Sequence, residues 1–310
     1  MTHANQNRPS AREQQQSAEA STLARFGKDL TQFAREGKTS PCFGRDSEIR
    51  QVLTALCKSK KRNVILTGPE GVGKTALIEG LAQLIVQGRA PRSLSESRII
   101  QLDMNAVVAG ASFKGEFEER LRTLLDEVIR SGSILFIDEF HTVIGGGNPA
   151  GGMDAANIMK PALARGEFQC IGATTDKEFR EIVEKDRALC RRFQSVKVNE
   201  PTADMTADIL LGALPKLGSH NNLIIPREVV GTVVQLSGRY VPDRRFPDKA
   251  LDLLDESAAL CRLRNEGTKA QAGLDTLKEL KRQAIASGDF EGAAEIHRRI
   301  LFAQEGGGVP

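Results

Sequence analysis

The stretch Gly68-Pro-Glu-Gly-Val-Gly-Lys-Thr75 decides the fold of this chain. It fits the pattern GxxxxGK[ST], in which glycines let backbone N–H groups close around phosphate oxygens. The run before it, Asn63-Val-Ile-Leu-Thr67, is apolar and partly β-branched like a buried strand. From Lys74 to Gln87 the apolar residues recur at helical spacing. A glycine-rich loop between a strand and a helix N-terminus predicts a P-loop nucleotide site.

This pattern assigns roles to the two residues that end the loop. Lys74 is expected to reach the β- and γ-phosphates of ATP, and the Thr75 hydroxyl is expected to coordinate Mg²⁺. ATP and Mg²⁺ are therefore the predicted cofactors. The expected nucleotide-binding set covers the loop and the start of its helix: Gly68, Pro69, Glu70, Gly71, Val72, Gly73, Lys74, Thr75 and Ala76.

The pattern on either side of the loop alternates between strands and helices. Strands are expected at 98–103, 133–137, 169–174 and 195–198, with helices between them, notably 115–130 and 154–164. Such alternation predicts an α/β fold with a parallel sheet covered by helices on both faces. The composition changes at 199–201, after which only helices are expected to about 264. Residues 271–303 are typical of two amphipathic helices with a break at 287–289.

A second motif, Ser133-Ile-Leu-Phe-Ile-Asp138-Glu139, is an apolar strand that ends in two acids. Open α/β sheets bind ligands at the carboxyl ends of their strands, so both acids should lie near the P-loop. We expect Asp138 to hold the Mg²⁺ shell and Glu139 to orient and polarise the attacking water. The acid pair favours hydrolysis over binding alone.

Two further groups have both a functional and an ordinary interpretation. Thr174 and Thr175 end another strand at the same sheet edge, where a hydroxyl could bond the γ-phosphate or the water. Arg191 and Arg192 stand just before the last strand. An arginine supplied by a neighbour neutralises transition-state charge in some hydrolases. A surface arginine pair is otherwise a solvated face.

The segment Ala111-Ser-Phe113-Lys114-Gly115 carries one aromatic and one cation among small residues. A phenylalanine in such a segment is ordinarily part of the core. The glycines at 110 and 115 instead favour an exposed loop, and an exposed aromatic indicates binding.

Composition excludes several classes of protein. The formal net charge is +3 over 310 residues, which counts against a nucleic-acid or membrane surface. The five cysteines form no CxxC pair, so reduced thiols in a cytoplasmic protein are expected rather than a metal site or disulfides. No apolar run approaches the length of a membrane helix, and residues 1–20 lack the apolar core of a secretory signal.

Taken together, the motifs resemble the first ATPase module of the Clp family of AAA+ unfoldases and disaggregases. The resemblance covers about 23–259, most of the chain. It rests on strings that occur in this order: Gly44-Arg-Asp46, the P-loop, Gly115-Glu-Phe-Glu-Glu-Arg-Leu121, Leu135-Phe-Ile-Asp-Glu139, Lys160-Pro-Ala-Leu-Ala-Arg-Gly166, Ile171-Gly-Ala-Thr-Thr175, Glu184-Lys-Asp186, Arg191-Arg-Phe193 and Pro247-Asp-Lys-Ala250.

The resemblance implies further roles. By it, Thr175 matches the sensor 1 residue, and Arg191 with Arg192 matches the paired arginine fingers that reach a neighbouring subunit's nucleotide. Phe113 and Lys114 match the central pore loop, where the family usually has Tyr. The backbone around Cys42 and Phe43 would contact adenine, where the family usually has two aliphatic residues. Asp248, after Pro247, would start the lid helix that caps the nucleotide.

The resemblance also names the expected domains. These are a disordered tail at 1–20, a large α/β ATP-binding domain at 21–199, an α-helical lid domain at 200–264, a helical hairpin at 265–303 and a flexible end at 304–310. The hairpin resembles a UVR-type hairpin, and a plain amphipathic hairpin is the equal alternative. The sequence contains one P-loop, no Gly-Ala-Arg sensor 2 string and no tripeptide of the kind that docks a peptidase. A folded N-terminal substrate domain is not expected in it.

The leading hypothesis is an oligomeric, ring-forming ATP hydrolase, expected to be hexameric, that remodels protein substrates. One alternative is an ATP-binding adaptor or regulatory subunit that joins mixed rings with a full-length relative. The third hypothesis is a nucleic-acid-handling AAA+ protein. The near-neutral net charge and the Phe-Lys-Gly loop count against it.

Overall fold

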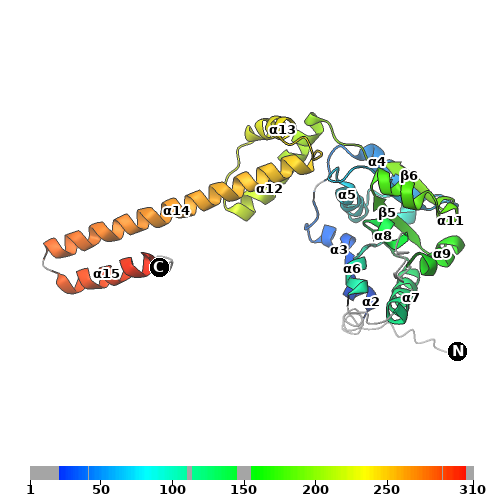
Figure 1. The fold of residues 1–310 in the computed structure, drawn as a ribbon, viewed down its shortest axis with the longest axis horizontal. Coiled ribbons are helices and arrows are strands. Elements are labelled where there is room, and N and C mark those ends of the chain that lie inside the picture. The colour runs from blue at the N-terminus through cyan, green and yellow to red at the C-terminus, as the bar shows by residue number, and fades with distance from the viewer. Residues whose placement is uncertain (1–20, 41, 110–113, 145–154, 288, 305–310) are drawn as a thin grey trace, which may run out of the picture. The chain divides into compact units, whose positions relative to one another are not determined.

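The computed structural model describes residues 21–40, 42–109, 114–144, 155–287 and 289–304 (Figure 1). The chain divides into two compact units, one of residues Met1–Ala213 and Val234–Ala250 and the other of Leu214–Val233 and Leu251–Pro310. This division follows contacts within the chain and does not test the domain boundaries expected at 199/200 and 264/265, which remain predictions. Among the helices that the structure describes, none is long and apolar enough to span a bilayer.

The first unit is built on a six-stranded sheet with the order β1-β3-β4-β5-β2-β6. Its parallel strands are β2 (Asn63–Thr67), β3 (Ile99–Leu102), β4 (Ile134–Ile137), β5 (Gln169–Thr174) and β6 (Phe193–Lys197). The predicted parallel α/β sheet is thus confirmed.

One strand of the sheet was not predicted. β1 (Gly27–Asp29) pairs antiparallel with β3 and so closes that edge of the sheet. It has only three residues, too few to show an alternating pattern in the sequence.

Apolar side chains on successive strand residues enter two separate cores, one on each face of the sheet. On β4, Leu135 and Ile137 belong to one core, whereas Ile134 and Phe136 belong to the other. Successive side chains of a strand point to opposite faces, so a strand buried on both sides must be apolar throughout.

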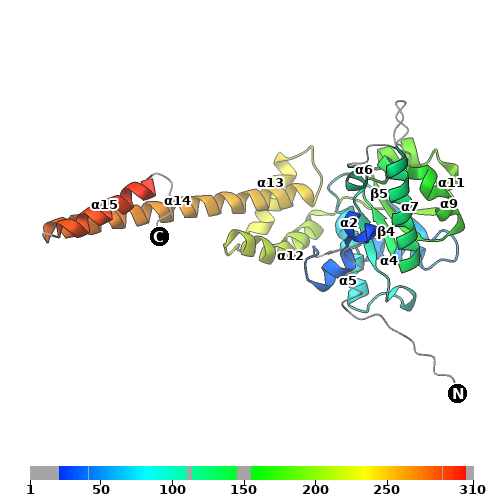
Figure 2. The ribbon, with the colours of Figure 1, turned by 90° about the horizontal axis from the view of Figure 1, so that it is seen from below.

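Helices cover both faces of the sheet (Figures 1 and 2). In chain order the helices of this unit, up to the start of the second unit, are α2 (Thr22–Phe26), α3 (Leu30–Arg35), α4 (Asp46–Leu56), α5 (Lys74–Val86), η1 (Arg92–Leu94), α6 (Met104–Val108), α7 (Lys114–Ser131), α8 (Phe140–Ile144), α9 (Ala155–Arg165), α10 (Asp176–Glu178), η2 (Phe179–Val183) and α11 (Arg187–Cys190).

The remainder of the chain is helical, as expected: α12 (Ala203–Asn221), α13 (Val229–Tyr240), α14 (Asp248–Ala286) and α15 (Phe290–Gln304). The predicted break near 287–289 is confirmed, and α15 lies beside the last part of α14 in both views (Figures 1 and 2). Leu277 and Ile300 are buried there. The first helix of this pair, however, begins at Asp248 rather than near 271, because α14 runs on through Gly267 and Gly273.

Close packing at Gly172 of β5 sets the position of α8. A Cβ atom added at Gly172 would lie 2.7 Å from Cγ of Phe140, the first residue of α8. Phe140 is itself buried, with its ring centroid 5.3 Å from that of Phe193. The ring therefore has little room to yield.

We expect Gly172→Ala to lower the free energy of unfolding by about 1–3 kcal/mol, since it overpacks a filled core. Chemical denaturation of the full chain measures this. Gly115→Ala is the matched control, because no atom lies within 4 Å of a Cβ built at Gly115. Equal stability of the two variants would contradict the packing argument.

Candidate nucleotide site

The P-loop follows β2, which is buried along its whole length. A Cβ atom on Gly68 would lie 2.2 Å from the carbonyl oxygen of Val198, so only glycine fits where the P-loop passes the segment after β6. Gly73 has φ +93° and stands immediately before α5. This left-handed conformation is cheap for glycine and turns the chain directly into the helix. The N-terminus of a 13-residue helix therefore faces the loop.

Lys74 holds its ammonium group at the centre of the loop. Its Nζ donates hydrogen bonds to the carbonyl oxygens of Gly68 and Pro69, each at 2.8 Å. Burial lowers the pKa of Lys74, and the nearby Asp138 carboxylate opposes that shift. A half-buried cation beside backbone N–H groups is a site for polyphosphate.

Thr75 and Asp138 meet although they are 63 residues apart in sequence. The Thr75 hydroxyl donates a hydrogen bond of 2.7 Å to Oδ2 of Asp138. A hydroxyl and one carboxylate are oxygen ligands of the kind that Mg²⁺ uses together with substrate phosphates. No cluster of three or more His, Cys, Asp or Glu residues that could hold a metal occurs within the described ranges.

Glu139 has an unusual backbone conformation, with φ +48°. Its N–H donates to Oδ1 of Asp138 at 2.9 Å, and its carbonyl accepts hydrogen bonds from both N and Oγ1 of Thr142. Non-glycine residues with positive φ are costly and cluster at functional sites. These bonds hold the turn and leave the exposed carboxylate of Glu139 at the carboxyl end of β4.

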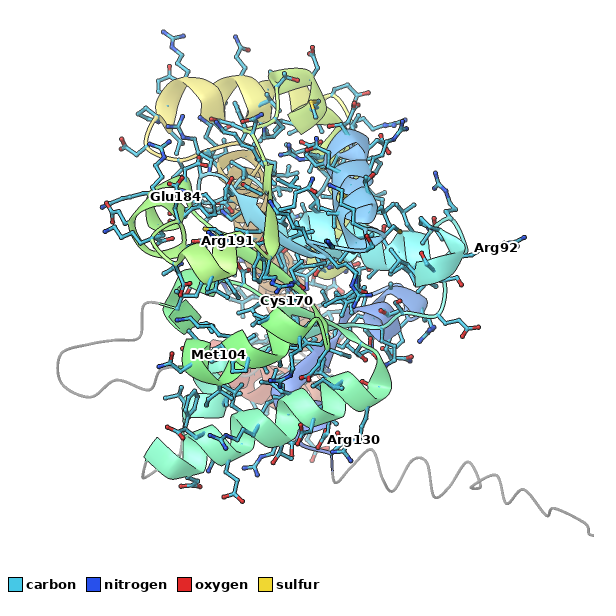
Figure 3. The ribbon with its side chains drawn as sticks, turned by 90° about the vertical axis from the view of Figure 1, so that its right-hand side faces the viewer. Arg92, Met104, Arg130, Cys170, Glu184 and Arg191 are labelled. Carbon is cyan, nitrogen blue, oxygen red and sulfur yellow. The ribbon has the colours of Figure 1, made fainter. Side chains whose placement is uncertain are left out.

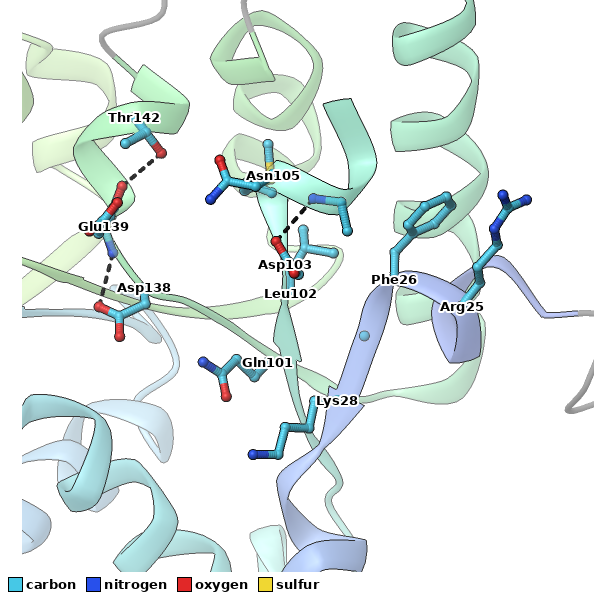
Figure 4. A pocket seen from close by; sticks show the side chains of 13 residues that line it. Arg25, Phe26, Lys28, Gln101, Leu102, Asp103, Asn105, Asp138, Glu139 and Thr142 are labelled. Carbon is cyan, nitrogen blue, oxygen red and sulfur yellow. Dashed lines mark hydrogen bonds between the residues drawn. The ribbon is translucent and has the colours of Figure 1, made fainter. Parts of the chain in front are cut away.

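A cleft of about 560 Å³ opens beside Glu139 (Figure 4). Asp138, Glu139 and Thr142 line one side of it, and residues of β1, β3 and α6 line the other. In Figure 4 the side chains of Gln101 and Lys28 point into the space in front of Asp138. The acid pair is thus open to solvent.

The two threonines that end β5 belong to one hydrogen-bond network. Thr175 caps α10: its hydroxyl donates to Oε2 of Glu178 at 2.7 Å and accepts from the Glu178 N–H. Thr174 lies 3.2 Å from Nδ1 of His141, which is also 3.0 Å from Glu178. The pKa of Glu178 is lowered, since the hydrogen bonds from Thr175 and the charge of His141 outweigh desolvation. His141 was not predicted from sequence.

A second cleft, of about 350 Å³, brings several predicted residues together. Pro69, Glu70 and Gly71 of the loop line it together with Thr175 and Asp248. Gly71 and Asp248 are in close contact, because an added Cβ on Gly71 would lie 2.8 Å from Cβ of Asp248.

Two arginines in this second cleft were not among the predicted residues. Arg244 donates to Asp248 at 2.6 Å, and Arg245 donates to Glu200 at 3.2 Å. Their guanidinium groups suit an anionic ligand. In the sequence they are visible only as two adjacent arginines before Pro247. The fold places both beside the P-loop.

Cys42 and Phe43 pack against helices. A Cβ on Gly80 of α5 would lie 2.5 Å from Cβ of Cys42, and one on Gly212 of α12 would lie 2.0 Å from the Phe43 ring. Burial raises the pKa of the Cys42 thiol to about 11. Cys42 therefore lies next to α5, the helix that follows the loop, and Phe43 lies against α12. The role of both residues at the adenine stays a prediction.

Arg45, in the Gly44-Arg-Asp46 string, was not predicted from sequence to be a site residue. It is 5% exposed, its Nη2 donates to the carbonyl of Val72 at 2.7 Å, and its Nη1 pairs with Glu48 at 2.9 Å. A buried arginine thus ties the P-loop to α4. Nothing local in the sequence separates it from a surface arginine.

We expect Arg45→Met to weaken nucleotide binding by about tenfold, because removing a buried, charge-assisted hydrogen bond of roughly 1.5–3 kcal/mol loosens the loop. Titration with a fluorescent nucleotide measures the dissociation constant. Arg50→Met, an exposed position on the same helix, is the control. An unchanged affinity in Arg45→Met would separate Arg45 from the site.

Arg191 and Arg192 lie at the opposite edge of the sheet from the P-loop. Both are exposed and directly precede β6, whose first residue, Phe193, pairs with Asn63 at the start of β2. The P-loop follows the other end of β2. Five strand residues separate the two edges by roughly 17 Å at about 3.3 Å per residue. The structure therefore does not bring these arginines to the P-loop of their own chain.

The pore-loop prediction lies outside what the structure describes. Phe113 is not among the described residues, and Lys114 is described only as the first residue of α7.

Comparison with known proteins agrees with this geometry. A family model described as "ATPase family associated with various cellular activities (AAA)" matches residues 64–199, and a model described as "AAA lid domain" matches 202–299. The chain is 46% identical over 282 residues to a probable ATP-dependent Clp protease ATP-binding subunit of Chlamydia pneumoniae, covering 89% of this chain and 33% of the relative. It is 45% identical over 289 residues to the chaperone protein ClpB of Oceanobacillus iheyensis, covering 91% and 36%.

Solved structures give the same picture. The Hsp104–ADP complex of S. cerevisiae superposes with a TM-score of 0.73 at 45% identity, covering 78% of this chain and 42% of the Hsp104 chain. The chain spans about a third of the length of the two relatives named above, from Chlamydia pneumoniae and Oceanobacillus iheyensis. The P-loop, the acid pair and the lid region all fall within matched segments. The chain is therefore a nucleotide-binding AAA ATPase module with its lid domain, and it belongs to the Clp family.

Proposed function

We propose that this chain hydrolyses Mg-ATP in a ring of subunits and uses the energy to remodel proteins. The observation that carries the proposal is the position of Arg191 and Arg192. They lie a full strand length from their own P-loop, yet they are exposed and adjacent to the ATPase sheet. In a head-to-tail ring, one edge of a subunit meets the opposite edge of the next. A site completed by a neighbour would then require assembly for activity.

Within the site, we assign the chemistry to this chain's residues as follows. The loop N–H groups and Lys74 bind the phosphates, and Thr75 with Asp138 would hold Mg²⁺. The ion would neutralise charge on the phosphates. Glu139 accepts a proton from the attacking water as a general base, and its rigid turn keeps the carboxylate aimed. Thr175 already donates its proton to Glu178, so its remaining lone pair suits a water hydrogen.

The substrate class is proposed from two sources. One solved relative is an Hsp104:casein complex of S. cerevisiae, at 45% identity over 79% of this chain. The other is the sequence pair Phe113 and Lys114, which we propose grips a polypeptide; Lys114 is the first residue of α7. Protein substrates and a ring, expected to be a hexamer or a mixed ring with a relative, are therefore part of the proposal.

An adaptor or regulatory subunit that joins rings of a full-length relative is the second candidate, favoured by the pair of helices α14 and α15, which extends beyond the expected lid domain. One experiment separates the two. ATPase activity is measured against protein concentration, with and without an unfolded protein such as casein. A rate per subunit that rises with concentration and with substrate supports assembly and remodelling. Negligible turnover by a stable monomer would favour the adaptor.

The predicted pore loop at Phe113 can be tested separately. We expect Phe113→Ala to abolish stimulation by casein and to leave basal turnover within about twofold, since an aromatic grip contributes to substrate binding and not to hydrolysis. Phe43→Ala is not a suitable control, because Phe43 adjoins the nucleotide. Phe33→Ala, on α3, serves instead. Full stimulation in Phe113→Ala would remove this residue from substrate handling.

A further inference from the structure

Two of the strings that carry the family resemblance, 160–166 and 184–186, meet in the structure. Nζ of Lys160, on α9, lies 2.8 Å from Oδ2 of Asp186, the residue immediately before α11. The two side chains are 33% and 18% exposed. Burial opposes ionisation of Asp186, but hydrogen bonds from Lys160 and from the start of α11 outweigh it and lower the pKa of the carboxyl group. The nucleotide site described above uses neither residue.

Asp186 also holds α11, which has only four residues. Its Oδ1 accepts hydrogen bonds from the N–H groups of Ala188 and Leu189, each at 3.1 Å. Aspartate is among the preferred residues at a helix N-terminus, and a single turn has few hydrogen bonds of its own. One carboxylate thus caps α11 with one oxygen and binds α9 with the other.

The arginine pair follows α11 directly, and Figure 3 shows Arg191 at the end of α11, next to β6. The N–H of Arg192 donates to the carbonyl of Leu189 at 2.8 Å. The carbonyl of Arg192 accepts a hydrogen bond of 3.4 Å from the side chain of Asn63. Asn63 is buried, and its Oδ1 accepts the N–H of Cys170 at 2.9 Å. The backbone of the pair is therefore fixed on both sides, although both arginine side chains are exposed.

We propose that Asp186, fixed by Lys160, is a positioning residue for Arg191 and Arg192. It sets where the arginine pair leaves the sheet, and so where the two guanidinium groups can reach. This inference rests on the proposed function, in which the pair acts on a neighbouring subunit's nucleotide. Misplacing an oriented group by about 1 Å can cost about 10²-fold in rate. A partly exposed ion pair contributes little to global stability, so its loss should affect turnover more than folding.

Asp29 provides a matched control at the other end of the sheet. Its Oδ1 accepts the N–H of Gln32 at 3.0 Å as the cap of α3, and its Oδ2 pairs with Arg98 at 2.9 Å. The side chain of Asp29 is 18% exposed, as is that of Asp186. β1, which carries Asp29, and β6 are the two outermost strands. Asp29→Ala therefore removes the same kinds of interaction far from the arginine pair.

In the full chain, we expect Asp186→Ala to reduce ATP turnover by about 10²-fold and Asp29→Ala to leave it within about twofold. The denaturation midpoints of the two variants should fall by similar amounts, since both lose a cap and an ion pair. Asp186→Asn keeps a capping oxygen and Lys160→Met keeps the whole cap, so each should lose only about tenfold in turnover. Equal turnover in Asp186→Ala and Asp29→Ala would overturn the inference.

Mixed assemblies separate positioning of the arginines from a general defect of the subunit. Asp186→Ala subunits keep an intact P-loop, and Lys74→Ala subunits keep correctly placed arginines. In their equimolar mixture about a quarter of random contacts join the two, so about a quarter of the turnover should return. A mixture of Asp186→Ala with Arg191→Ala/Arg192→Ala should stay as slow as its components, because neither partner supplies a correctly placed pair.

Recovery in neither mixture would assign Asp186 a structural role, and recovery only with the arginine variant would place its defect at its own P-loop. Either result overturns the inference. The mixture of Lys74→Ala with Arg191→Ala/Arg192→Ala tests the proposed function separately. If that mixture stays inactive, the proposed function fails and this inference fails with it. If it recovers while Asp186→Ala does not behave like the arginine variant, only this inference fails.

Discussion

Glu139→Gln is expected to slow ATP turnover by about 10²- to 10⁴-fold and to leave nucleotide affinity within about threefold. The amide keeps the size and shape of the side chain but cannot accept the proton of the attacking water. Nucleotide binding should survive, because the groups assigned to the phosphates are Lys74 and the loop N–H groups. The backbone bonds of Glu139 to Asp138 and Thr142 do not involve the carboxylate, so the turn should also survive.

Single-turnover and steady-state ATPase assays measure this change, and titration with a fluorescent nucleotide measures affinity. Glu96→Gln, an exposed acid, controls for the loss of charge. The variant should accumulate as an ATP-bound assembly. Turnover within threefold of the unsubstituted chain would exclude Glu139 as the general base.

The second large effect concerns the arginine pair. Arg191→Ala/Arg192→Ala is expected to reduce turnover by about 10³-fold or more, in the range found for arginines supplied by a neighbour. Nucleotide affinity in dilute, unassembled protein should not change, because both residues lie at the far edge of the sheet.

Mixing two inactive variants tests whether the arginines act across subunits. Lys74→Ala subunits have a defective P-loop and intact arginines, whereas the double arginine variant has the reverse. In a random equimolar mixture, about a quarter of the contacts join an intact P-loop to an intact arginine pair, so about a quarter of the turnover should return. Adding Glu139→Gln to the arginine variant should abolish this recovery. A mixture as inactive as its components would show that the arginines do not act in trans.

The sequence and the structure contributed to this site in different ways. Motifs built from neighbouring residues were predictable, because their chemistry depends on local spacing: the loop 68–75 lies where its strand and helix patterns placed it. The meeting of Thr75 and Asp138 was also predictable, since parallel strands bring their carboxyl ends to one edge of a sheet.

Other features depended on contacts between distant segments. β1 was missed because three residues carry no periodic signal. The continuity of α14 was missed because the sequence predicted separate helices before about 264 and after 271, whereas α14 runs unbroken from Asp248 to Ala286. Arg45 and His141 look like ordinary polar residues until burial and partners are known.

By itself, the sequence predicted a nucleotide site on a parallel α/β sheet and an acid pair at the end of the strand beside the P-loop. Local patterns suffice for that, because each motif positions its own atoms. Only the tertiary structure decided that Arg191 and Arg192 lie a strand length from their own P-loop and share an edge with Lys58 to Arg62. Strand order and register set those positions, and they arise from packing along the whole sheet rather than from any one segment.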